Sequence, residues 1–127
     1  MHTKILMSLS AFLMAVAGLA ASFLPKEILA YAGAWDEGFE VFLVQVLGAL
    51  YLGFAMLNWM ARINLIGGIY SRPVAMGNFM HFVVVAATLV KAVFAGFHSF
   101  EMIAAVAIYV IFALWFGAVI FTHPLKK

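Results

Sequence analysis

Apolar residues form four long runs along the chain, and most polar residues lie between these runs. The runs cover 5–24, 39–60, 74–97 and 102–122. Each has about the 20 residues that an α-helix needs to cross a hydrocarbon core. Strands of a membrane barrel would be half as long and would alternate apolar with polar residues, which these runs do not. Because a backbone in lipid must satisfy its own hydrogen bonds, the pattern predicts four transmembrane helices.

The composition also favours a membrane protein. Hydrophobic residues make up 68% of the 127 residues and charged residues only 9%, against about 25% charged in a typical soluble domain. We therefore predict an all-α membrane protein, a four-transmembrane-helix bundle that forms a single domain over 1–127. The sequence contains no Cys, which excludes disulfides and thiolate metal sites.

The segments between the runs contain turn residues. Pro25 follows the first run, Pro73 suits the first turn of the third helix, and Pro124 follows the fourth run. The segment PKEILAYAGAW, 25–35, is too short to span a bilayer. We expect it to lie along the outer surface as an interfacial turn or short helix.

The first run has a second interpretation as a secretory signal peptide. Lys4, the apolar stretch and the small residues at 17–21 are features of such a peptide. The separation of basic and acidic residues between the two sides of the membrane, described below, is expected only if this helix is retained. We therefore expect the first run to be a transmembrane helix.

Charged residues differ between the two sides of the predicted bundle. With four spans, both termini and the 61–73 loop share one side. That side carries only basic residues: Lys4, Arg62, Arg72, Lys126 and Lys127. The other side carries all the acids: Glu27, Asp36, Glu37, Glu40 and Glu101. Because short loops rich in Lys and Arg stay in the cytoplasm, we expect both termini there. We expect Arg62 and Arg72 to contact lipid phosphates.

Small residues recur at helical spacing and predict close helix packing in lipid. The first helix has five on one stripe: Ser8, Ala11, Ala15, Gly18 and Ser22. The second helix has Ala49 and Gly53, and the fourth has Ala113 and Gly117. These residues pack either within the four-helix bundle, which we favour, or between copies of the chain.

Polar residues form a stripe on the third helix, which contains Asn78, His81, Thr88 and Lys91. Polar groups in membrane helices usually face other helices or a wet cavity. Lys91 lies about 9 Å from the outer end, so its stem can extend to the surface. It is alternatively a partner of Glu40, Glu101 or Gln45, a base with a lowered pKa, or a ligand of an anionic headgroup.

His81 lies nearer the inner end of the third helix, at about 10 Å from it. We favour a neutral imidazole that is hydrogen-bonded in a cluster with Asn78 and Asn58. The alternative is a residue that senses pH or contacts a ligand. The other spans contain no second histidine for haem, and the chain shows no metal-binding spacing, so we expect no metal and no cofactor.

Three strings resemble small four-helix bacterial inner-membrane proteins of the DoxX-like type: LMAVAGLAASFLP, GALYLGFAMLNW and RPVAMGNFMHF. The resemblance covers most of the chain and concerns its architecture. It implies a four-helix fold in a bacterial cytoplasmic membrane and assigns no site residues.

These features support two hypotheses about function. The first is a non-enzymatic bundle that associates with copies of itself, with a larger membrane complex or with lipid, since no catalytic set is present and nothing points to nucleic acid. The second is a small transporter or enzyme for a hydrophobic substrate, with a site between the second and third helices. That site would use six residues: His81, Asn78, Asn58, Thr88, Gln45 and Lys91.

Overall fold

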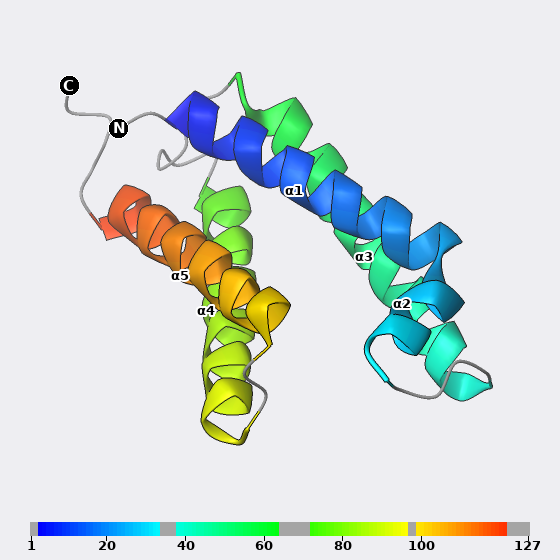
Figure 1. Cartoon of the computed structure of the whole chain (residues 1–127). Helices are drawn as coiled ribbons and strands as arrows, with labels where there is room; N and C mark the ends of the chain where they lie inside the picture. Colours follow the sequence, from blue (N-terminus) through cyan, green and yellow to red (C-terminus); the bar gives the residue numbers. More distant parts are fainter. Residues whose placement is uncertain (1–2, 34–37, 64–71, 97–98, 122–127) are drawn as a thin grey trace. The chain divides into compact units, whose positions relative to one another are not determined.

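The computed structural model describes residues 3–33, 38–63, 72–96 and 99–121, and these residues form five α-helices without any strand. The helices are α1 (Thr3–Phe23), α2 (Pro25–Tyr31), α3 (Phe39–Ala61), α4 (Arg72–Phe94) and α5 (Phe100–Phe121) (Figure 1). All except α2 are long and apolar enough to cross a membrane. The predicted all-α class with four spanning helices is thus confirmed, and the chain fits a multi-pass membrane protein.

Residues at the helix ends explain where the helices begin and end. Helix α4 lies two to three residues earlier than the predicted 74–97, because Pro73 is tolerated in its first turn and Gly96, with φ of 118°, adopts a left-handed conformation just beyond its end. Helix α5 begins at Phe100 rather than 102, because the Ser99 hydroxyl accepts a hydrogen bond of 3.2 Å from the Met102 N–H. Helix α2 lies inside the segment that was expected to form an interfacial turn or short helix.

The chain divides into two compact units, which we describe separately. One covers Met7–Met60 and contains most of α1, all of α2 and nearly all of α3. The other contains Met1–Leu6 and Ala61–Lys127, and therefore α4 and α5.

The first unit is built on a close approach of α1 and α3, which lie side by side (Figure 1). A Cβ atom on Gly48 would lie 2.5 Å from the Ser22 Oγ and 2.9 Å from the Gly18 carbonyl oxygen. A Cβ atom on Gly18 would lie 2.9 Å from the Leu52 backbone nitrogen. The two backbones are therefore in direct contact, and only glycine fits at these two positions.

The second unit is built on aromatic packing between α4 and α5. The Phe82 ring is fully buried and stacks on Phe112 and Phe116, with ring centroids 5.0 and 5.6 Å apart. Nearer the end of α5, the Phe79 ring lies edge-on to Phe121 at 5.9 Å and also covers Gly117. Helix α5 therefore packs on α4 over several turns.

The glycine contact yields a prediction. Gly48→Ala places a methyl group against the α1 backbone, so we expect it to lower the free energy of unfolding by about 1–3 kcal/mol. Gly53 of the same helix has no atom within 4 Å of its Cβ position, so Gly53→Ala should stabilise the helix by about 0.5–1 kcal/mol. Unfolding curves in detergent measure both values, and equal effects at the two glycines would contradict the described contact.

Candidate functional site

Asn58 and Ser10 form a buried polar contact between α3 and α1. The Asn58 Nδ2 donates to the Ser10 Oγ at 3.0 Å, and that hydroxyl donates to the Met7 carbonyl oxygen at 3.1 Å. The Met14 Sδ lies 3.9 Å from the same Asn58 nitrogen. Both polar side chains are fully buried. This chain of hydrogen bonds holds the amide of Asn58 against α1.

Sequence reasoning did not select Ser10. A serine hydroxyl in a helix commonly bonds a carbonyl of its own helix, so serine in a span carries little signal by itself. Ser10 makes that local bond and also accepts a bond from another helix. Its second role depends on the angle at which α3 faces α1, which periodicity along one helix does not define.

His81 is hydrogen-bonded to Tyr109 of α5. The Tyr109 hydroxyl lies 3.4 Å from the His81 Nε2, and both side chains are half-buried. The Phe82 ring stands edge-on to the imidazole, with ring centroids 5.1 Å apart. Sequence reasoning missed Tyr109, although a tyrosine in the interior of a span is a signal, since tyrosines of membrane helices usually gather at the interfaces.

Asn78 and Thr88 both bond the backbone of α4. The Asn78 Nδ2 donates to the Val74 carbonyl oxygen at 2.9 Å, and the Thr88 hydroxyl donates to the Val84 carbonyl oxygen at 2.9 Å. Asn78 is buried, whereas Thr88 is exposed. Local bonds of this kind let a polar residue sit in lipid without a ligand.

Lys91 lies in the last turn of α4 and is exposed. Its positive charge complements the negative end of the helix dipole there, and its exposure suits a side chain that extends to the membrane surface. Gln45 is also exposed, on α3. Pairing of Lys91 with Glu40, Glu101 or Gln45 stays a prediction.

The six candidates for a shared polar site belong to different units. Asn58 and Gln45 lie in the Met7–Met60 unit, and the four residues of α4 lie in the other. A site that joins α3 to α4 therefore stays a prediction. The same holds for lipid phosphates at Arg62, which is half-buried just after α3, and at Arg72, the exposed first residue of α4.

The small residues predicted for helix packing have different surroundings. Gly18 and Ser22 face Gly48, as described above, and Gly117 lies under Phe79, next to buried Ala113. Ser8 is half-buried. Ala49 and Gly53 are exposed on α3, so the packing predicted for them would need a partner outside this helix pair.

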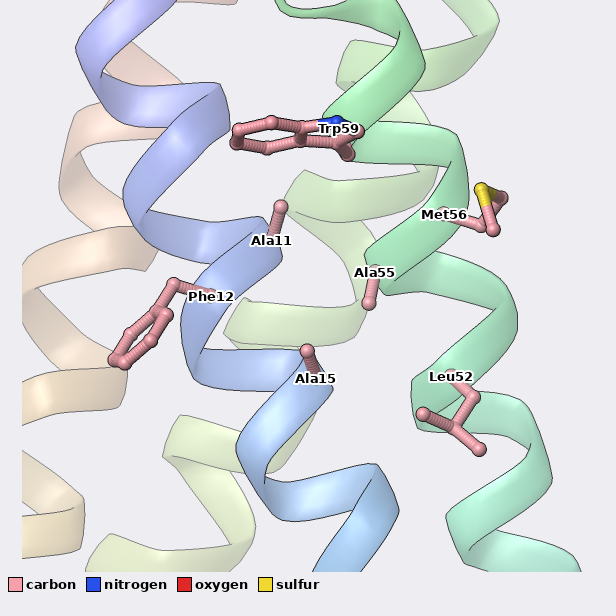
Figure 2. A pocket seen from close by; sticks show the side chains of 7 residues that line it. All are labelled: Ala11, Phe12, Ala15, Leu52, Ala55, Met56 and Trp59. Atoms are coloured by element: carbon pink, nitrogen blue, oxygen red, sulfur yellow. The ribbon is translucent and has the colours of Figure 1, made fainter.

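Ala11 and Ala15 line an open groove between α1 and α3, which we call the α1–α3 groove. Its volume is about 500 Å³. It is bounded by Ala11, Phe12, Ala15, Leu52, Ala55, Met56 and Trp59 (Figure 2). The Trp59 ring reaches toward α1 at one end, and Leu52 lies at the other (Figure 2). The groove is almost wholly apolar.

Metal ligands do not gather in the described part of the chain, where no three His, Asp or Glu side chains lie close enough to hold an ion. His2, His98 and His123 lie outside the described residues.

The Ser10–Asn58 bond can be measured by a double-mutant cycle. Hydrogen bonds between membrane helices contribute on average about 0.6 kcal/mol and up to about 1.7 kcal/mol, so Ser10→Ala and Asn58→Ala should be coupled by an amount in that range. Unfolding free energies of the two single variants and the double variant give this value. Thr88→Ala with Asn58→Ala is the matched control and should be additive. Additive effects of Ser10→Ala and Asn58→Ala would show that the bond contributes nothing.

Comparison of the chain with known proteins found no matching family model, no matching curated protein and no matching solved structure. The resemblance to DoxX-like proteins therefore stays a prediction.

Proposed function

We propose that this protein is a non-enzymatic membrane protein that acts by helix–helix association, as a homo-oligomer or an accessory subunit of a membrane complex. One observation carries this proposal: among the described residues, every buried side-chain nitrogen and oxygen atom has a hydrogen-bond partner. A substrate site usually keeps polar groups that only its ligand satisfies. The buried polar side chains of the described residues already have structural partners.

The association face that we propose is the exposed side of α3 that contains Ala49 and Gly53. Small residues let helix backbones approach closely in lipid, where association depends on packing and hydrogen bonds. The glycine that α3 uses against α1 is Gly48, so Ala49 and Gly53 are not needed for that contact. We propose that they contact a helix of a second copy instead.

We further propose that the protein lies in a bacterial cytoplasmic membrane with both termini in the cytoplasm. The distribution of Lys and Arg supports this orientation, and the resemblance to DoxX-like proteins supports the type of membrane.

Single-cysteine variants test the association face, because the chain has no cysteine of its own. We expect Ala49→Cys and Gly53→Cys to form disulfide-linked dimers in native membranes. Leu47→Cys is the matched control: it is exposed on the same helix but points roughly 120° away from Gly53. It should form several-fold less dimer. Equal cross-linking at all three positions would contradict the proposed face, and a heavier product with another protein would instead indicate an accessory subunit.

The orientation is tested by reporters fused to the C-terminus. A reporter that is active only in the cytoplasm should be active, and one that is active only after export should be silent, because basic residues hold both ends of the chain inside. The opposite pattern would overturn the proposed orientation.

A further inference from the structure

Helix α1 combines the sequence features of a secretory signal peptide with tight packing against α3. Lys4 lies in its first turn, and the apolar stretch 5–14 follows. Two triplets with small residues at their first and third positions come next, AVA at 15–17 and GLA at 18–20. A basic residue, an apolar stretch of this length and an A-x-A-like triplet are the three parts of a cleavable signal. The peptide bonds that this pattern marks for signal peptidase are those that follow the two triplets.

The backbone just beyond each of these bonds lies against α3. Both bonds are inside α1, which ends at Phe23. Gly18 follows the first bond, and a Cβ atom added to it would lie 2.9 Å from the Leu52 backbone nitrogen and 3.0 Å from the Gly48 carbonyl oxygen. Ser22 lies shortly after the second bond, and a Cβ atom on Gly48 would lie 2.7 Å from its backbone nitrogen. Helix α3 therefore covers the segment that a peptidase would have to bind.

The close packing of α1 on α3 opposes proteolysis. A peptidase cleaves a packed helix from conformations in which the helix has opened locally, so the rate of cleavage follows the population of the open form. Opening α1 at Gly18 removes the direct contact between two backbones, which keeps that population small. The residues of this contact all belong to the Met7–Met60 unit, so the protection needs neither α4 nor α5.

We propose that the contact between α1 and α3 protects a latent signal-peptidase site in α1 and thereby keeps this helix in the mature protein. Cleavage there is a hydrolysis: water adds across the peptide bond, and the product begins with the free amino group of Gly18 or Ala21. This role goes beyond the proposed association. It rests on the proposed orientation, which places this end of α1 on the outer side of the membrane, where secretory signals are removed.

The test uses the full chain with a C-terminal tag, made in bacterial membranes, and mass spectrometry identifies its first residue. Gly48→Ala and Gly48→Leu open the contact from α3 and leave the sequence of α1 unchanged. We expect Gly48→Ala to raise the cleaved fraction at least about fivefold, and Gly48→Leu to raise it further. Gly53→Leu is the matched control, because nothing lies within 4 Å of the Gly53 Cβ position. It should stay intact, like the natural protein.

Two further samples distinguish signal peptidase from other proteases. A specific inhibitor of signal peptidase should abolish the cleaved product of Gly48→Leu. Ala17→Leu together with Ala20→Leu, added to Gly48→Leu, should abolish it as well, because a large residue at the last position of each triplet destroys the cleavage pattern.

Four outcomes would overturn the proposal. They are cleavage of the natural protein at either bond, intact chains in both Gly48 variants, equal cleavage of Gly48→Leu and Gly53→Leu, and a product that persists with the inhibitor. If Gly48→Leu is degraded without a defined product, Gly48→Ala decides, because it perturbs the contact less.

The reporter at the C-terminus separates failure of the site from failure of the orientation. Intact Gly48 variants with a cytoplasmic C-terminus would contradict the latent site alone. Intact Gly48 variants with an exported C-terminus would contradict the orientation and the site together.

Discussion

The contact between Gly18 and Gly48 determines how the first unit is built. Lipid is as apolar as the helix surfaces, so burial of leucine or valine gives little drive for helices to associate. Dispersion contacts and hydrogen bonds must therefore stabilise the association of helices, and both require short distances between atoms. The two glycines bring the backbones of α1 and α3 into contact. At that separation Asn58 reaches Ser10, and the residues between these two contacts line the α1–α3 groove.

In the second unit, different residues bring two helices into close contact. Phe79 and Phe82 of α4 pack against α5. Their contacts there are Gly117, Phe112 and Phe116. Flat rings that stack near 5 Å give a large contact area without any polar group. His81 and Tyr109 add a polar contact beside this stack. The buried polar residues of the spans thus contribute to helix packing, in agreement with the association that we propose.

Length and composition were sufficient to predict the four spanning helices, because a bilayer of known thickness constrains both. The small residues Gly18 and Ser22 were also predictable as packing residues, since an unbranched stripe at helical spacing allows close approach. Pairing of side chains was harder to predict. Equal depth suggested Asn58 and Asn78 as partners of His81, and this cluster stays a prediction. The partner that the structure does show, Tyr109 of α5, was not predicted.

Pairing was harder to predict because the sequence does not define how each helix is rotated about its own axis. Depth along a helix follows from residue number, but the direction in which a helix faces its neighbour depends on all its contacts together. Gly48 and Ala49 are adjacent in sequence and about 100° apart around α3, and the structure turns Gly48 rather than Ala49 toward α1. Because this rotation was unknown, the contacts of Ser10 and Tyr109 with other helices could not be predicted from the sequence.

Solid-state NMR of glycine-labelled protein in lipid bilayers tests the central contact most directly, without any mutation. A carbon–carbon correlation spectrum should show a cross-peak between Gly18 and Gly48, because the backbone of each lies against the other. Gly53, which has open space around its Cβ position, should show no cross-peak to a glycine of α1. Helical chemical shifts without the cross-peak between Gly18 and Gly48, or with a cross-peak from Gly53 to α1 in its place, would contradict the packing on which this account rests.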